Sequence, residues 1–308
     1  MTISPILITG GSGQLASSLA ARARARGLAA IHVGRPEFDY DRPETIAASF
    51  HAARPGLVIN AAAYTAVDAA QTDAAAAARA NHPGPAALAA LCQAHGVPLI
   101  HVSTDYVFDG RKGAPYVETD PTAPQGVYGA TKLAGERAVL ASGAPAIVMR
   151  TSWVYSATGK NFVRTMLNAG HRLQTQGGET GRLRVVADQH GCPTAAEDLA
   201  VAILNIAGTI LADGWRERYA GVVHAAGSGA TSWHGLAMAA FAAASRHGRR
   251  MPQIDPIATA DWPTPAPRPV DSRLDCTRLH QVFSQTLPPW RDSVERVVDA
   301  LLDAEIAV

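Results

Sequence analysis

"ILITGGSGQLASSLA" (residues 6–20) joins an apolar run, a glycine-rich turn and a helix-forming segment in direct succession. Gly10, Gly11 and Gly13 allow the backbone to turn tightly and approach a pyrophosphate, which the free N–H groups and dipole of a helix N-terminus attract. Ala16 stands where the usual dinucleotide-binding pattern has its last glycine, a position that mainly serves helix packing. A plain strand-to-helix turn is the alternative, so the interpretation depends on the segments that follow.

The first 150 residues repeat this rhythm of short apolar runs and longer helical patterns. The apolar runs predict strands at residues 6–9, 30–33, 57–60, 99–103 and 146–150. The helical patterns cover residues 14–26, 43–53, 68–79, 83–95 and 127–141. Such alternation is typical of right-handed βαβ crossovers in a parallel sheet covered on both faces. We therefore predict an α/β fold, a Rossmann-type doubly wound sheet that binds its ligand beyond the carboxyl ends of the strands.

After Arg150 the rhythm loosens, and loops rich in polar residues, glycine and proline separate the helical patterns. These loops include TSWVYSATGKNF, ADQHGCPT, AAGSGATSW and DWPTPAPRPVDSRLDC. We predict an NAD(P)-binding domain over residues 1–150 and a smaller C-terminal domain over residues 151–308 that is mostly substrate-binding. Some segments of the second part are expected to return to the first.

Composition excludes several classes of function. The 27 Lys and Arg nearly balance 26 Asp and Glu, so the chain has no electrostatic footprint for nucleic acid or an anionic membrane. Cys92, Cys192 and Cys276 are far apart and form no CxxC motif, which favours a reducing cytoplasm over a disulfide framework or zinc site. The N-terminus lacks a signal-peptide pattern, and no apolar run approaches the roughly 20 residues of a membrane span. We expect a cytoplasmic protein with no nucleic-acid or membrane partner.

The second and third predicted strands carry the next cofactor signals. The second ends in HVGRPEFD, with no acid at its tip to bind a ribose 2′-hydroxyl, and Arg35 there suits a 2′-phosphate. This favours NADPH, with NADH possible, although Arg35 can equally be a solvated loop charge. After the third strand, Ala61, Ala62 and Ala63 leave room for a flat ring system, or simply pack.

A Thr, Tyr and Lys set follows the fourth predicted strand. Thr104 leaves the carboxyl end of that strand, and Tyr128 and Lys132 lie one helical turn apart on one face. Reduction of a carbonyl needs a phenol that protonates the developing alkoxide, a nearby ammonium that favours the phenolate, and a hydroxyl that hydrogen-bonds the oxygen. A surface pair and a strand-end cap are the ordinary alternatives. The joint occurrence of the three residues after a nucleotide-binding turn favours catalysis.

Several longer motifs resemble the extended short-chain dehydrogenase/reductase superfamily and, within it, the dTDP-4-dehydrorhamnose reductase family. They include GGSGQL, VINAAAYTAVDAAQ, HVSTDYVFDG, VYGATKLAGE, RTSWVYS, NFVRTML, DQHGCPT and RPVDSRLD, which span nearly the whole chain. The resemblance implies reduction of the 4-keto group of dTDP-4-dehydro-β-L-rhamnose to dTDP-L-rhamnose with NADPH. This is the last step of dTDP-rhamnose biosynthesis, a supply route for polysaccharide biosynthesis.

The resemblance also implies residue roles. Tyr128 would donate the proton, Lys132 would orient the nicotinamide ribose and lower the pKa of the tyrosine, and Thr104 would hydrogen-bond the 4-keto oxygen. The other implied contacts are Gly10, Gly13, Gln14 and Leu15 with the cofactor pyrophosphate, Asp39 and Tyr40 with its adenine side, Ala61, Ala62, Ala63 and Thr65 with its middle, and Asp105 and Trp153 with the sugar. Arg268 is a candidate clamp for the substrate diphosphate, since a guanidinium binds phosphate oxygens bidentately. An exposed loop arginine is its alternative.

No metal site is expected. Some members of the family are dimers bridged by a divalent metal that a first-helix carboxylate binds, and the matching residue here is Ser18, a poor ligand for a hard cation. The protein is therefore expected to be a monomer or a homodimer. His101 is predicted to be a core residue of the fourth strand, and His190 and His234 to lie in loops near the site.

Two other functions stay open at this point. One is a different nucleotide-sugar reductase or epimerase on the same scaffold, which as an epimerase would keep its NAD bound throughout. The other is a non-catalytic regulatory subunit of the same fold, such as the regulatory β subunit of methionine adenosyltransferase, which also keeps a YxxxK motif. TSWVY and DQHGCPT favour a working sugar site.

Overall fold

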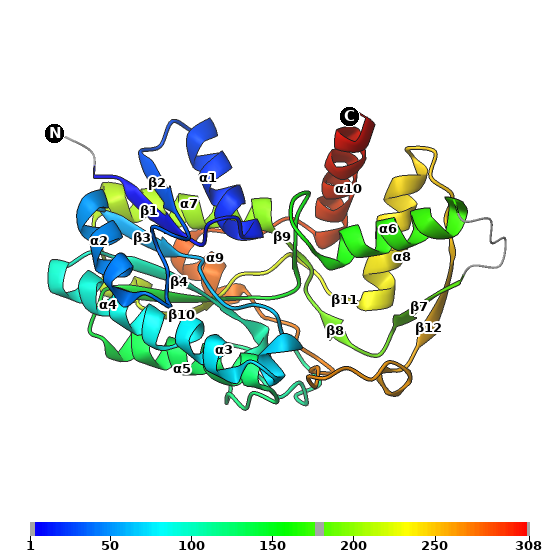
Figure 1. Ribbon diagram of the computed structural model, residues 1–308, viewed down its shortest axis with the longest axis horizontal. Helices are drawn as coiled ribbons and strands as arrows, with labels where there is room; N and C mark the ends of the chain where they lie inside the picture. The colour runs from blue at the N-terminus through cyan, green and yellow to red at the C-terminus, as the bar shows by residue number, and fades with distance from the viewer. Residues whose placement is uncertain (1–3, 176–181, 307–308) are drawn as a thin grey trace.

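A six-stranded parallel sheet forms the centre of the N-terminal part of the molecule (Figure 1). The computed structural model describes residues 4–175 and 182–306. The sheet has the order β10-β5-β4-β3-β1-β2, and all its neighbouring strands run parallel. Its strands are β1 (Ile6–Thr9), β2 (Ala30–Val33), β3 (Leu57–Asn60), β4 (Leu99–Thr104), β5 (Ala146–Thr151) and β10 (Gly221–His224). The predicted Rossmann-type doubly wound fold is confirmed.

The buried strands are short apolar runs with both faces covered, which is why they lack polar alternation. Every residue of β1, β3 and β5 is buried, whereas β2, at the edge of the sheet, is mostly exposed. β4 and β5 each extend one residue beyond the predicted end, because Thr104 and Thr151 continue the ladder opposite each other. These two threonines therefore reach the carboxyl edge together.

Helices cover the two faces of the sheet. One face carries α1 (Gln14–Ala25) and α7 (Ala196–Asp213), which pack together over Ile6, Ile8 and Ile59. The other carries α2 (Pro43–Ala53), α4 (Pro83–His95) and α5 (Val127–Ala141), which cover Leu7 and Val58. Alternate residues of one strand thus enter two different cores, as the pleat requires.

The predicted helix at residues 68–79 is wrong in its extent. A 3-10 turn, η1 (Ala69–Gln71), is followed by a separate helix, α3 (Ala74–Asn81). Asp73 separates η1 from α3, because its side chain accepts a hydrogen bond from the N–H of Ala76 and so caps the N-terminus of α3. Aspartate favours this N-cap position over the interior of a helix.

Part of the second half returns to the sheet. β10 pairs with β5, α7 packs on α1, and α9 (Thr277–Phe283) lies against β10. Segments of the second predicted domain, residues 151–308, thus complete the central sheet. The assignment of residues 1–150 to the cofactor and 151–308 mostly to the substrate stays a prediction.

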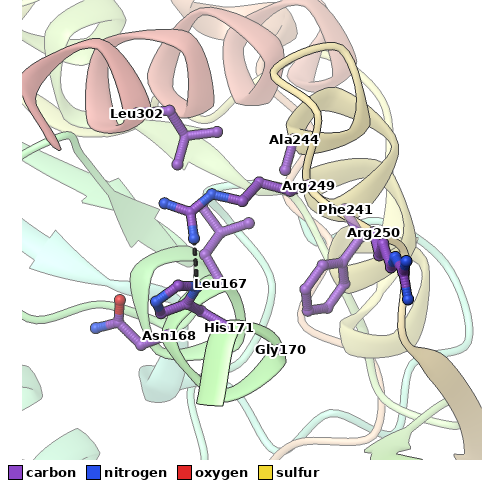
Figure 2. A pocket seen from close by; sticks show the side chains of 9 residues that line it. All are labelled: Leu167, Asn168, Gly170, His171, Phe241, Ala244, Arg249, Arg250 and Leu302. Atoms are coloured by element: carbon purple, nitrogen blue, oxygen red, sulfur yellow. Dashed lines mark hydrogen bonds between the residues drawn. The ribbon is translucent and has the colours of Figure 1, made fainter. Parts of the chain in front are cut away.

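The remaining segments form a smaller layer of helices and short strands beside the sheet (Figure 1). It contains β6 (Val154–Tyr155), α6 (Phe162–Thr175), β7 (Arg182–Val186), β8 (His190–Gly191), β9 (Thr194–Ala195), β11 (Thr231–Ser232), α8 (Trp233–Ser245), β12 (Gln253–Ile257) and α10 (Trp290–Ile306). Figure 2 shows how α6, α8 and α10 meet around a pocket of about 30 Å³, where Arg249 hydrogen-bonds His171 and so joins the chain after α8 to α6.

Over the described residues, no helix combines the length and apolar character that crossing a membrane requires. The same residues contain no cluster of three or more His, Cys, Asp or Glu side chains that could hold a metal ion. Ser18 is buried on α1.

Candidate active site

A cavity of about 400 Å³ lies at the carboxyl edge of the sheet, where the smaller layer approaches it. The glycine turn after β1, the ends of β3 and β4, the first turns of α5 and the loop after β5 all contribute to its wall. Its lining includes Gly10, Gly13, Gln14, Leu15, Ala61, Ala63, Thr65, Thr104, Asp105, Tyr128, Lys132 and Trp153, which are most of the predicted site residues.

The glycine turn forms one wall and needs its glycines. Gly10 and Gly11 have φ values of +122° and +50°, and a Cβ on Gly10 would lie 2.9 Å from the carbonyl carbon of Ala61. Gly13 caps α1 without a side-chain hydrogen bond, and the first turn of α1 carries no acid. Among the described residues, no capping side chain or first-turn acid serves the first N–H groups of the helix, so they suit an anionic ligand.

A second hollow of about 410 Å³ lies against the same turn. Its lining includes Gly10, Arg35, Tyr40, Ala62 and Ala63, so it shares Gly10 and Ala63 with the first cavity. The two hollows therefore adjoin at the glycine turn and at the end of β3.

Arg35 and Asp39, both predicted cofactor residues, are paired with each other in this second region. Arg35 donates from Nε to Asp39 at 2.9 Å and from its NH2 group to Asp41 at 2.9 Å. Burial acts to raise the pKa of Asp39, but hydrogen bonds from Asp41 N–H and Arg35 hold it below its ordinary value. Arg35 lines the second hollow and Asp39 does not. Tyr40 is buried, lines the same hollow, and donates a hydrogen bond from its hydroxyl to Oδ1 of Asn60 at 2.8 Å.

Tyr128 and Thr104 meet in the first cavity. Burial raises the pKa of Tyr128 to about 12, a hydrogen bond with Thr104 opposes this, and the charge of Asp105 adds to it. The ring of Tyr106 packs edge-on against Tyr128 at 5.5 Å between centroids. The phenol is therefore fully protonated at neutral pH.

Lys132 contacts the backbone of the neighbouring strand β4. Its Nζ donates to the carbonyl of Val102 on β4 at 2.7 Å, and burial lowers the pKa of Lys132 to about 8 against an opposing effect of Glu136. Burial, Thr104 and Asp105 are the causes of the shift of Tyr128, and Lys132 is not among them. The expected lowering of the pKa of Tyr128 by Lys132 stays a prediction.

Asp105 is a further ionisable group of the cavity. It is buried, and its Oδ2 has no hydrogen-bond partner among the residues the structure describes. Burial raises the pKa of Asp105 to about 6, although hydrogen bonds with Ser272 and Thr104 oppose the rise. An unsatisfied buried carboxylate oxygen in a cavity is suited to a hydroxyl donor on a ligand.

Trp153 lines the cavity on the side of the smaller layer, and its backbone has a φ of +47°. Its indole stacks on Trp233, with 3.5 Å between centroids and 4° between planes. Trp233 was missed from the sequence, where it reads only as the last letter of AAGSGATSW, beside a serine that caps α8. Lys160 was also missed and lines the cavity. The only signal for it was a lone basic residue in SATGKNF.

Arg268 is not among the residues that line the cavity, and its role as a diphosphate clamp stays a prediction. Its guanidinium forms a bidentate pair with the carboxylate of Asp68, at 2.7 and 2.8 Å. One donor of each terminal nitrogen of Arg268 is thus engaged with a carboxylate.

The three histidines have structural positions. His101 is buried in β4 and its Nδ1 contacts Nδ2 of Asn60 at 2.9 Å. His190 lies in β8 and His234 in the first turn of α8, so the prediction that both lie in loops is wrong. None of the three lines the first cavity.

Comparison with known proteins gives a consistent result. A family model described as "RmlD substrate binding domain" matches residues 4–302. A dTDP-4-dehydrorhamnose reductase of Sinorhizobium fredii is 43% identical over 96% of this chain and 97% of the relative. One of Escherichia coli is 37% identical over 96% of this chain and 97% of the relative.

Solved structures agree with these sequence relatives. A dTDP-4-dehydrorhamnose reductase of Clostridium acetobutylicum superposes with a TM-score of 0.86 at 33% identity, covering 97% of this chain and 99% of the other. One of Bacillus anthracis, solved in complex with NADP, superposes with a TM-score of 0.84 at 29% identity, covering 96% and 98%.

Proposed function

The chain belongs to the RmlD substrate binding domain family, and from this premise we propose that it is a dTDP-4-dehydrorhamnose reductase. It reduces the 4-keto group of dTDP-4-dehydro-β-L-rhamnose to the hydroxyl of dTDP-L-rhamnose, with NADPH as the reductant. The observation that carries the proposal is one cavity at the sheet edge that contains the glycine turn, Thr104 and Tyr128.

The residues around the two hollows fit such a cofactor. The N-terminus of α1 is free of side-chain caps and acids, and Gly10 leaves no room for a Cβ beside Ala61. NADPH supplies a hydride when bound. Gly10, Gly13, Gln14 and Leu15 would hold its diphosphate, Ala61, Ala62, Ala63 and Thr65 its middle, and Tyr40 and Arg35 its adenosine end.

Tyr128 is proposed as the proton donor. As hydride adds to C4, the bond from carbon to oxygen loses its double-bond character and negative charge develops on the oxygen. The phenol of Tyr128 gives its proton to that oxygen, and Thr104 donates a hydrogen bond to it. The high pKa that burial gives Tyr128 supports this direction, because the phenol carries its proton before the reaction.

Lys132 is proposed to orient the nicotinamide ribose and to compensate the tyrosinate that remains after proton transfer. Its ammonium must then exchange its contact with Val102 for one with the ribose, or share the two. Asp105 and Trp153 are proposed to contact the sugar ring, and Arg268 only if its pair with Asp68 opens. The cytoplasmic location and the choice between monomer and homodimer stay proposals.

The test follows NADPH absorbance with the 4-keto precursor generated in place, in the wild type and in Tyr128→Phe. We expect Tyr128→Phe to lose roughly 10²- to 10⁴-fold in kcat, the usual contribution of a general acid. Binding of NADPH, measured by fluorescence titration, should be retained and would show that the variant is folded.

Two results would contradict this proposal. Equal rates for the two proteins would remove Tyr128 from the chemistry. A wild type that binds NADPH but never oxidises it with this substrate would exclude the reductase activity. An enzyme purified with one tightly held NAD per chain would instead favour an epimerase.

A further inference from the structure

The Trp153 backbone is held in an unusual conformation by the segment around Cys192. A φ of +47° is rare for a bulky residue and persists only where surrounding contacts impose it. Ser152 donates its hydroxyl to the carbonyl of Cys192 at 2.7 Å, and the N–H of Thr194 donates to the carbonyl of Trp153 at 3.2 Å. The two sequence motifs TSWVY and DQHGCPT are therefore one structural unit.

The Trp153 ring is confined as well. Its plane is 4° from that of Trp233, with 3.5 Å between centroids, an almost eclipsed stack. Aromatic pairs left to themselves prefer offset or edge-on arrangements at larger centroid separations. On another side, a Cβ on Gly191 would lie 2.4 Å from Cε2 of Trp153. The face-to-face arrangement of Trp153 and Trp233 is thus determined by the surrounding residues and not by the intrinsic preference of the two rings.

Trp233 has its own anchors. Its Nε1 donates to Oε1 of Gln189 at 3.1 Å, and Nε2 of Gln189 donates to Thr259 at 3.1 Å. Phe162 packs against the Trp233 ring at 4.7 Å, and Ser232 caps the helix that begins at Trp233. Trp233 does not line the first cavity, whereas Trp153 does.

From these contacts we propose that Trp233 is the positioning residue for the sugar site: it fixes the plane of Trp153 against the sugar ring of the substrate. This deepens the proposed function and rests on its assignment of Trp153 to the sugar. Sites that act on sugars depend on such preorganised surfaces, because loose side chains must be ordered when the ligand binds. Trp233 therefore acts on sugar-nucleotide affinity and leaves the cofactor hollows unchanged.

The experiment compares Trp233→Phe, Trp233→Leu and Gln189→Ala with the wild type, with Trp262→Phe as the matched control. Trp262 is 53% exposed and belongs to the same half of the chain. We measure kcat, KM for the sugar nucleotide, the dissociation constant of NADPH, and the far-ultraviolet circular dichroism couplet of the stacked indoles. Binding of dTDP-L-rhamnose is titrated independently of turnover.

Trp233→Leu should weaken binding of the sugar nucleotide roughly three- to tenfold, the range for an aromatic pair. It should also abolish the couplet and leave NADPH affinity within about twofold of the wild type. Gln189→Ala should shift the same two readouts less, and Trp233→Phe should lie between wild type and Trp233→Leu. Trp262→Phe should change none of them.

Loss of the couplet with unchanged sugar-nucleotide affinity would overturn the inference, because Trp153 would then need no partner. Equal losses of NADPH and sugar affinity in a variant that keeps its fold would also overturn it, since Trp233 would then not act on the sugar site alone. If Trp233→Leu fails to fold, Gln189→Ala and Trp233→Phe decide the question. Trp153→Phe tests the assignment of Trp153 separately from the reductase proposal. If this variant is active and its sugar affinity is unchanged, the assignment of Trp153 to the sugar fails. An inactive wild type counts only against the reductase proposal.

Discussion

Asp105 is a buried residue whose ionisation can be tested through the stability of the protein. Burial raises its pKa to about 6 in the folded chain, whereas an unfolded aspartate has a pKa near 3.9. Between these values the folded state binds more protons than the unfolded state, so stability falls as the pH rises through this window. The carboxylate contributes an unfavourable term above pH 6 that is absent near pH 4.

Asp105→Asn should therefore remove a pH-dependent part of the stability. Relative to the wild type, the variant should gain about 2 to 3 kcal/mol between pH 4 and pH 7, an order-of-magnitude value from the shift of about two units. Urea unfolding of both proteins at the two pH values measures this difference. A constant difference across the range would mean that Asp105 keeps an ordinary pKa.

Residue types and their order in the sequence predicted most of the cavity but not the orientation of its side chains. The glycine turn, Thr104 and Tyr128 follow from strand ends and helical spacing. Lys132 satisfies that spacing too, yet its Nζ contacts the carbonyl of Val102, and nothing local encodes that choice. Arg268 pairs with Asp68, 200 positions away in the chain, a contact that only the tertiary fold creates.

At the scale of elements, α5 carries Tyr128 and Lys132 and can approach its neighbours closely because of two glycines. A Cβ on Gly129 would lie 2.2 Å from the carbonyl oxygen of Tyr106, and one on Gly135 would lie 2.0 Å from that of Asn81. A real side chain requires the helix to move, since backbone atoms cannot yield as a flexible side chain can. The position of the catalytic helix thus depends on the absence of two methyl groups.

Gly135→Ala should destabilise the protein by roughly 1 to 3 kcal/mol, the usual cost of overpacking, and lower kcat through displacement of α5. The matched control is Gly208→Ala on α7, where a Cβ would meet no atom within 4 Å. There alanine should stabilise the helix by about 0.5 to 1 kcal/mol. Thermal unfolding of both variants, together with kcat, tests the contrast. Stability changes of the same sign in the two variants would contradict this explanation of the close approach of α5.

The elements themselves were largely predictable because their signals are local. Strands β1, β2 and β3 and helices α2, α4 and α5 have the predicted ends, helped by prolines at the first positions of α2 and α4. The interruption at Asp73 was not predicted, because the alanine-rich run around it favours helix on propensity alone. The pairing of β10 with β5 was not predicted either, since a four-residue strand such as GVVH contains no signal that identifies its partner strand.

At the scale of the whole molecule, residues 1–150 do not contain a complete sheet. β10 covers the edge of β5, and α7 covers α1, whose Leu15, Leu19 and Ala23 are buried in the core they share. A fragment that ends near Thr151 would expose that strand edge and that apolar helix face. Exposed edges and apolar faces of this kind favour aggregation over independent folding.

The fragment of residues 1–155 should therefore show no cooperative thermal transition and no NADPH binding, whereas the full chain should show both. Circular dichroism melting and fluorescence titration measure the two properties. A fragment that melts cooperatively and binds NADPH would show that α7 and β10 are dispensable, and that the division at residue 150 marks an autonomous unit.

The late arrival of β10 also bears on how the chain is made. Roughly 70 residues separate the end of β5 from the end of β10, and at synthesis rates of about 5 to 20 residues per second they take some 4 to 15 seconds to emerge. During that time the nascent chain holds five strands with an open flank. The N-terminal half of the chain thus emerges before the strand that completes its sheet, and premature termination anywhere before His224 yields a chain without the complete sixth strand.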